Sequence, residues 1–401
     1  MVSSTRERQN IVEGIFAIHK PPFLTSAAVL RNLQTHFNPS TIFSPWLRSE
    51  RARLKRADAR RRRINQLQVK LGHGGTLDPL ATGVLIVGVG RGTKCLQRFL
   101  ECTKTYECIV LFGAATDSYD AMGQVVSRAE YAHVTQRKVE EALERFRGKI
   151  MQKPPVFSAL RVGGKRMYEF ARAGVEVPEV KAREVEVKEL EMVEWLEGGC
   201  HDFHWPKEEV DNAEKIRPAN ITGIRDVKDD ENTEETKDPK RRREGMEGVD
   251  VCVFEAASQF KRAKMEVEPD MSGALPVKET LIKSNCLPMQ ENVPAPSSLR
   301  PFENRPNPPA ARLRMTVTSG FYVRSLCHDL GLAVNSLGLM SSLIRSRQGN
   351  YELGRNVLEY EDLEKGEDVW GPKVKSALEE FMTSEGWEAE DVLAEDKELE
   401  S

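Results

Sequence analysis

A long segment without regular apolar spacing, residues 197–309, divides this chain and limits the folds open to it. The segment is rich in Lys, Glu, Asp, Asn and Pro, a composition that buries too little apolar surface to offset the chain entropy lost on folding. A compact domain rarely contains a structureless loop of this length. We therefore expect a mostly disordered low-complexity insertion, with the folded core assembled from stretches on both sides of it.

Two patterned stretches precede the insertion in the first part of the chain. Residues 15–18 are apolar and predict a short strand, and Ser26 is placed to cap the helix that follows. The apolar runs 84–89 and 106–113 predict buried strands, the second bounded by a glycine. Residues 39–66, which lie between the helix after Ser26 and the run 84–89, are predicted not to pack because they are strongly basic.

Two further stretches carry helical and strand spacing. Apolar residues in 139–146 recur at helical intervals, with Thr135 placed as the cap and Gly148 as the end. Residues 313–317 alternate between apolar and polar and predict a half-buried strand, and the apolar spacing in 326–334 predicts a helix. The mixture lacks a βαβ rhythm, so it favours an α+β fold.

Charge is segregated along the chain although the net charge is only −3. Residues 48–63 hold nine lysines and arginines against two acids, and residues 385–401 hold eight acids against one lysine. A chain of this kind can bind polyanions locally while staying near neutral overall.

Several classes of protein are disfavoured by what the sequence lacks. No run approaches the roughly 18 apolar residues of a membrane span, and the N-terminus has no apolar core of a secretion signal. The seven cysteines are odd in number and form no CxxC pair, which indicates free thiols in a reducing compartment. Cys200, His201 and His204 have no matching pair of ligands elsewhere, so we expect no metal site.

The densest chemical pattern is the glycine-rich stretch 71–85, LGHGGTLDPLATGVL. Its glycines permit a tight loop, and Pro79 holds Asp78 out of the helical region. The effect is a carboxylate fixed on a rigid loop just before a buried strand. A plain Asx-type turn into that strand is the alternative interpretation.

This stretch resembles the catalytic loop of the TruB family of pseudouridine synthases. The resemblance extends in order through four further motifs, which are Lys20-Pro21, 104–106 with Thr116-Asp117, 154–168, and 320–326 followed by Leu343, Arg345 and Arg347. It implies a pseudouridine synthase fold, with a central mixed, largely antiparallel sheet flanked by helices. It also implies isomerisation of uridine in RNA, a reaction that needs no cofactor and no metal.

The family pattern implies three catalytic residues. Asp78 supplies the carboxylate that acts at the ribose, as a nucleophile or as a base. Arg324 pairs with Asp78 and keeps it charged and oriented, and Tyr106 stacks on the target base. A tyrosine at the start of a strand is more often an ordinary core residue, so the role of Tyr106 depends on the resemblance.

The pattern also implies substrate-binding residues. Tyr322 and Leu343 wall the pocket, or are ordinary core, and Lys20 supports it. His73 fills the space left by the flipped base, or is a loop histidine hydrogen-bonded to backbone. Lys165 and Arg166 suit contacts to phosphates.

We expect the catalytic domain to comprise three segments flanked by extra elements. The ranges are 14–38, 67–195 and 310–365 for the domain, 39–66 for a basic insertion, 197–309 for the low-complexity insertion and 367–401 for an acidic C-terminal tail. The short tail leaves no room for the RNA-binding domain of the guide-dependent branch. The sequence therefore favours a monomer of the stand-alone, eukaryotic type that acts on uridine 55 in the T loop of tRNA.

Two other functions stay open, a guide-RNA-dependent pseudouridine synthase and a non-catalytic RNA chaperone of the same fold. The basic residues 48–63 predict extra RNA contact or nuclear import, or are a solvated charge run, and 240–243 is a second candidate import signal. We expect a nuclear protein with a mitochondrial share as the second location.

Overall fold

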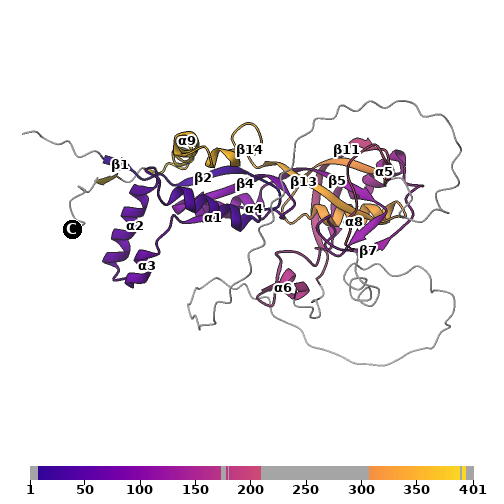
Figure 1. Ribbon diagram of the computed structural model, residues 1–401, viewed down its shortest axis with the longest axis horizontal. Coiled ribbons are helices and arrows are strands. Elements are labelled where there is room, and N and C mark those ends of the chain that lie inside the picture. The colour runs from indigo at the N-terminus through magenta and orange to yellow at the C-terminus, as the bar shows by residue number, and fades with distance from the viewer. Residues whose placement is uncertain (1–7, 173–177, 179, 209–306, 389–390, 394–401) are drawn as a thin grey trace, which may run out of the picture. The chain divides into compact units, whose positions relative to one another are not determined.

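The computed structural model describes residues 8–172, 178, 180–208, 307–388 and 391–393 (Figure 1). All of them belong to one compact unit, made of 1–225 and 296–401. The second unit, 226–295, lies outside the described residues, and so does most of the predicted low-complexity insertion.

The described unit contains helices, short 3₁₀ turns and strands. The helices are α1 Ser26–Phe37, α2 Ser44–Arg56, α3 Arg61–Asn65, α4 Leu96–Glu101, α5 Gln136–Leu143, α6 Met167–Arg172, α8 Val323–Ala333 and α9 Glu367–Ser384, with 3₁₀ turns η1 Gly90–Cys95, η2 Glu144–Phe146 and η5 Tyr360–Leu363. The strands are β1 Arg8–Asn10, β2 Gly14–Lys20, β3 Leu71–His73, β4 Thr82–Val89, β5 Lys104–Phe112, β6 Ala114–Thr116, β7 Val125–Arg128, β8 Gly148–Gln152, β9 Arg161–Val162, β10 Lys165–Arg166, β11 Arg183–Leu196, β12 Ala310–Val317, β13 Gly338–Gln348, β14 Tyr351–Glu352 and β15 Asp391–Leu393.

One nine-stranded sheet organises the unit. Its main path runs β2-β4-β13-β5-β12-β11-β8, with β3 paired to β4 and β14 paired to β13. Only β4 and β13 pair in parallel, through Ile344 with Thr82 and Arg345 with Gly83. The other pairs in this sheet are antiparallel, so the predicted mixed, largely antiparallel sheet is confirmed.

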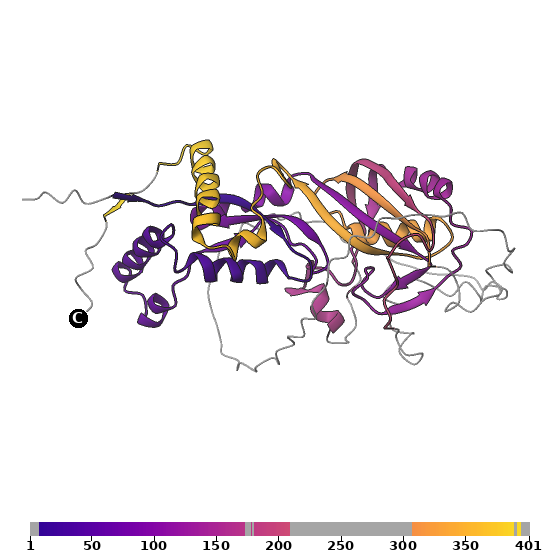
Figure 2. The same cartoon turned by 45° about the horizontal axis from the view of Figure 1, so that its top comes forward.

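Separate hydrophobic cores cover the two ends of the sheet. Around β5, β12 and β13, buried residues of α5 and α8 pack on the sheet. Around β2 and β4, buried residues of α1 and α9 do the same. Figures 1 and 2 show α5 and α8 at one end of the sheet and α1 and α9 at the other.

The predicted strands and helices around these cores are present, with corrections at their ends. Thr135 caps α5 as expected, because its side chain accepts from the Lys138 N–H. Thr25, not Ser26, caps α1, and the Ser26 hydroxyl bonds to Leu77. Gly148 does not end the α5 helix but begins β8 with a positive φ of 75°.

The expectation that residues 39–66 do not pack is wrong. They form α2 and α3, and Phe43 is fully buried, with its ring centroid 4.4 Å from that of Phe37. Trp46 is also buried, and its indole N–H donates to Glu13 at 2.8 Å. The basic side chains occupy the exposed faces of the helices, whereas a few apolar residues anchor α2 in the core.

The expectation of an acidic tail over 367–401 is wrong for its first part. Residues 367–384 form α9, whose buried Trp370, Val374 and Leu378 recur at helical spacing. The start of the low-complexity insertion also packs, since the Trp205 indole donates to the Phe112 carbonyl at 2.9 Å. The predicted starts of the acidic tail and of the low-complexity insertion are both too early, because the high charge of these segments hides the few apolar residues that pack.

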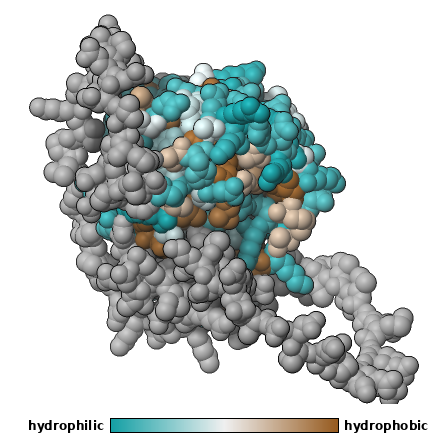
Figure 3. All heavy atoms as spheres, turned by 90° about the vertical axis from the view of Figure 1, so that its right-hand side faces the viewer, coloured by the Kyte–Doolittle hydropathy of each residue, from teal (hydrophilic) through white to brown (hydrophobic). Residues whose placement is uncertain are grey.

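Among the described helices, none has the length and apolar character needed to cross a bilayer. The face that carries α5 is mainly hydrophilic, with hydrophobic side chains in small areas between charged and polar ones (Figure 3).

Trp370 tests the packing of α9. Its side chain is 2% exposed and its ring lies 5.1 Å from that of Phe37, so Trp370→Ala leaves a large cavity. We expect a loss of about 3–5 kcal/mol in the free energy of unfolding, measured by denaturant titration. Lys375→Ala on the same helix is the control and should change stability by about 0.5 kcal/mol or less. Equal stabilities of the two variants would contradict the packing of α9.

Candidate active site

A cavity of about 290 Å³ opens where loops from the two ends of the sheet meet. Its lining comes from the loop before β4, the start of β5, the loop before α8 and the middle of β13. The polar and aromatic lining residues include Asp78, Lys104, Tyr106, Ser158, Tyr322, Arg324 and Arg345, with Leu343 among the apolar ones. Five of the predicted site residues therefore share one cavity, namely Asp78, Tyr106, Tyr322, Arg324 and Leu343.

Asp78 and Arg324 form a two-bond ion pair in this cavity. Arg324 Nε lies 2.8 Å from Asp78 Oδ2, and Nη2 lies 3.0 Å from Oδ1. The guanidinium also donates to the carbonyls of Ser118 at 2.9 Å and Phe157 at 2.8 Å. The Arg324 side chain is 6% exposed and that of Asp78 is 30% exposed. The guanidinium of Arg324 is thus buried and hydrogen-bonded to Asp78 and to two carbonyls, while the Asp78 carboxylate remains accessible from the cavity.

A second carboxylate, Asp120, lies behind the pair. Its Oδ2 is 3.8 Å from Arg324 Nε, and its other oxygen accepts from the Ser118 hydroxyl at 2.7 Å and the Met122 N–H at 3.0 Å. Burial raises the pKa of Asp120, and the Arg324 charge opposes that rise. Asp120 is absent from the cavity lining and acts as a turn former that also faces the guanidinium.

Lys20 holds the loop that carries Asp78. Its ammonium is buried and donates to the carbonyls of Pro21 at 2.7 Å, Pro79 at 3.1 Å and Ala81 at 2.6 Å. Burial lowers the pKa of Lys20 to about 8, while the charge of Asp78 raises it. The predicted supporting position of Lys20 corresponds to these bonds beneath the loop.

Two residues of β13 hold the same loop from its other side. Arg345 donates to the carbonyls of Val84 at 2.7 Å and Gly75 at 3.2 Å. Gln348 donates to the carbonyls of Gly74 at 2.6 Å and Phe99 at 2.8 Å. Sequence reasoning placed Arg345 in a motif without a role and missed Gln348.

The aromatic walls come from different elements. Tyr106 is 9% exposed on β5. Tyr322 precedes α8, and its backbone N–H and carbonyl bond to the Gln152 side chain at 2.8 and 2.9 Å. Arg183 lies over the Tyr322 ring, 5.6 Å from its centroid. Leu343 is buried on β13. Two aromatic rings and one aliphatic side chain thus line the same cavity as the Asp78 carboxylate.

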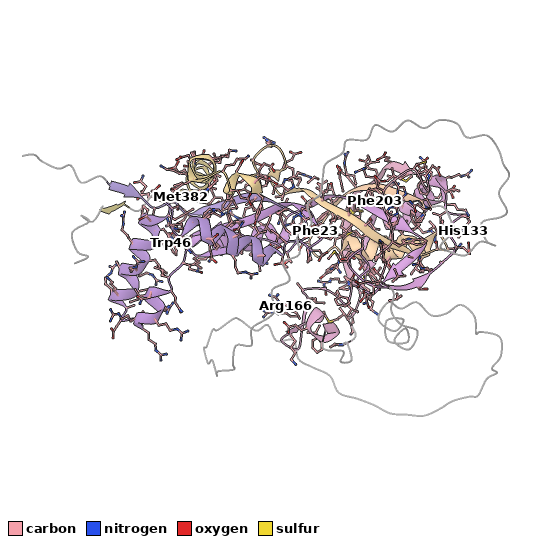
Figure 4. All side chains as sticks on the ribbon, in the orientation of Figure 1. Phe23, Trp46, His133, Arg166, Phe203 and Met382 are labelled. Carbon is pink, nitrogen blue, oxygen red and sulfur yellow. The ribbon has the colours of Figure 1, made fainter. Side chains whose placement is uncertain are left out.

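Four predicted substrate-binding residues do not line the cavity. Lys20 lies beneath the loop that carries Asp78, and the other three lie on β3 and β10. His73 is half-buried on β3, its Nδ1 is a buried atom with no hydrogen-bond partner, and burial lowers its pKa, with Arg345 and Arg166 adding to the effect. Lys165 and Arg166 are exposed on β10, which forms a hairpin with β9 (Figure 4).

Comparisons with known proteins agree with this geometry. Residues 61–205 match the family model described as "TruB family pseudouridylate synthase (N terminal domain)". The chain is 38% identical over 348 residues to "tRNA pseudouridine synthase 4" of Schizosaccharomyces pombe, covering 85% of this chain and 79% of the relative. It is 30% identical to the protein of the same name in Saccharomyces cerevisiae, covering 93% and 86%. The chain belongs to the TruB family of pseudouridine synthases.

A bacterial relative matches a shorter region. "tRNA pseudouridine synthase B" of Phocaeicola vulgatus is 45% identical over 133 residues, which covers 33% of this chain and 56% of the relative. Family membership makes this chain an isomerase that converts uridine to pseudouridine. The motifs behind the predicted TruB resemblance thus identified the right family.

The ionisation of Lys20 makes stability depend on pH. The folded protein releases the Lys20 proton near pH 8, whereas the ordinary pKa of lysine is 10.5. Between these values the unfolded chain binds more protons, so stability rises with pH. Lys20→Met removes this contribution. We expect the unfolding free energy of the wild type, minus that of the variant, to increase between about pH 8 and 10.5 in denaturant titrations. Parallel pH curves would contradict the lowered pKa.

Proposed function

We propose that this enzyme isomerises uridine 55 in the T loop of tRNA without a guide RNA. The two fungal relatives named as tRNA pseudouridine synthases support tRNA as the substrate. The observation that carries the catalytic assignment is the Asp78–Arg324 pair, which presents an accessible carboxylate to a cavity walled by aromatic rings.

The chemistry needs a carboxylate beside the sugar. The C1′–N1 bond of uridine breaks, the base turns, and C1′ bonds to C5. C5 loses its proton and N1 gains one, so no atom enters or leaves overall. Asp78 acts either as nucleophile at C1′ or as base at C2′, and both routes need its ionised form. Arg324 keeps that charge compensated and its two oxygens in place.

The remaining roles follow the position of each side chain. The target base must leave its stack to reach the cavity, at a cost that is smallest in loops. Tyr106 stacks on the base that enters, and Tyr322 with Leu343 closes the walls. His73 fills the place of the flipped base in the loop. Outside the cavity, Lys165 and Arg166 contact phosphates.

Asp78→Asn tests the proposal. We expect pseudouridine formation at position 55 of a tRNA transcript to fall by at least about 10³-fold in single-turnover assays, because the amide cannot act as nucleophile or base. Unchanged tRNA affinity would show that the variant is folded.

Asp117→Asn is the matched control. The Asp117 carboxylate accepts from the Gln124 N–H at 3.0 Å and does not line the cavity, so near wild-type activity is expected. Product formation by Asp78→Asn at the wild-type rate would refute the catalytic role of Asp78, and wild-type protein that forms no product would leave the chaperone function. Product that forms only with an added guide RNA, or at another uridine, would refute stand-alone action at position 55.

A basic surface on α2 and α3 extends the RNA contact we propose. It consists of exposed side chains, and its members are Arg51, Lys55, Arg56, Arg60, Arg61, Arg62 and Arg63. The buried Phe43 and Trp46 anchor α2 to the core, so these charges stand on a fixed support and not on a free arm. A fixed array of cations suits the sugar–phosphate backbone of a folded RNA.

Replacing Arg61, Arg62 and Arg63 by Gln tests this surface. We expect weaker tRNA binding and a log–log salt slope smaller by about one for each arginine that contacts a phosphate. The control replaces Arg137, Lys138 and Arg145 by Gln, which removes three charges around α5 at the other end of the sheet. An unchanged slope combined with loss of nuclear accumulation would assign the surface to import, in keeping with the proposed nuclear location.

A further inference from the structure

Phe23 is a large apolar side chain that the fold leaves in water. It is 67% exposed, more than any other exposed large hydrophobic residue in the described part of the chain. It belongs to none of the hydrophobic clusters formed there, whereas its neighbour Leu24 packs against the core around β2. The ring therefore contributes little to the burial that stabilises the unit.

The backbone at Phe23 is also unfavourable for this residue type. Its φ is 63°, in the left-handed region where side chains with a Cβ are disfavoured and glycine is preferred. The surroundings hold it there. The Phe23 N–H donates to the Pro79 carbonyl at 2.7 Å, and the Lys20 ammonium links the carbonyls of Pro21 and Pro79. Strain of this kind persists only where neighbouring contacts over-determine the conformation, and it concentrates at functional sites.

The position of Phe23 ties it to the catalytic loop. Pro79, its backbone partner, directly follows Asp78. Ser26, three residues after Phe23, exchanges hydrogen bonds with the backbone of Leu77 at 3.0 and 3.3 Å. Both ends of the turn that carries Phe23 are thus bonded to the loop that carries Asp78. The aromatic ring, labelled in Figure 4, and the carboxylate are therefore carried by two segments that are hydrogen-bonded to each other.

We propose that Phe23 stacks on a nucleobase of the RNA substrate beside the target uridine. This inference rests on the proposed function. When the target base leaves its stack, a neighbouring base loses a stacking partner, and an exposed aromatic ring on the turn bonded to the Asp78 loop replaces it. Every base has a π face, so the contact adds affinity without requiring a particular base. The hydrogen-bonded turn that carries the ring is already ordered, so little backbone freedom is lost when the RNA arrives.

Phe23→Gly is the deciding variant because it removes both the ring and the strain. We expect folding to be retained, since glycine accepts the positive φ. The KM for an isolated T-arm hairpin and for whole tRNA should rise by about 5- to 150-fold, the range of one lost base–aromatic stack. The kcat should stay within a few-fold of wild type. Phe23→Trp, which keeps a stacking surface, should preserve the wild-type KM.

Leu332→Ala is the matched control, an exposed hydrophobic residue on α8 that is 45% exposed. It should leave both constants unchanged. A wild-type KM for Phe23→Gly would overturn the inference, and so would a loss confined to kcat, which would make Phe23 a support for the loop. If the proposed function is wrong, the result is different: the wild-type protein forms no pseudouridine in the T-arm hairpin or in whole tRNA.

Discussion

The ion pair between Asp78 and Arg324 joins two parts of the chain that lie 246 positions apart. A buried guanidinium is costly unless its donors are satisfied, and removal of one partner from such a pair costs more than the intact pair contributes. Arg324 meets this demand with Asp78 and two backbone carbonyls. The loop before β4 and the start of α8 must therefore come together for either to be stable. The contact that orients the carboxylate also fixes the geometry of the fold around it.

Three donors complete this arrangement, Lys20 from beneath the loop and Arg345 and Gln348 from its other side. Each of them donates hydrogen bonds to backbone carbonyls of the loop and its flanks. The loop's carbonyls are thereby turned toward the protein interior. The side chain of Asp78 is left as the loop's charged group facing the cavity. The loop that carries Asp78 is therefore held in place by hydrogen bonds from side chains to its backbone, and the Asp78 carboxylate remains accessible from the cavity.

The sequence allowed the family, the sheet type and the members of the cavity to be predicted, because short motifs carry them. Asp78 and Arg324 belong to such motifs, and each lies where a strand or helix begins. Gln348 was missed for a physical reason. The pairing of β13 with β5 shifts register between Arg345 and Arg347, so simple alternation of side chains fails beyond the shift. A bulge of this kind depends on pairing with a distant strand and leaves no local trace.

The packing of α2 and α9 was missed for a different reason. Charge density marked residues 39–66 and 367–401 as solvated, yet a few large side chains decide burial. Phe43 and Trp370 both pack on Phe37 of α1. Which partner covers an apolar helix face is set by tertiary contacts. The average composition of a segment does not reveal one or two large apolar residues such as Phe43 and Trp370. Only the folded chain shows that the charged helices α2 and α9 complete the core around β2.

The parallel contact between β4 and β13 limits how the site can vary. Gly83 has a φ of 107°, and a Cβ there would lie 2.3 Å from the Arg345 carbonyl oxygen. Any side chain at this position would push β4 away from β13. Since β4 follows the Asp78 loop and β13 carries Leu343 and Arg345, that displacement would open the cavity and draw the carboxylate away from its support. The tolerance of the site to substitution is therefore set first by backbone clearance between two strands, and only then by the chemistry of the side chains that line the cavity.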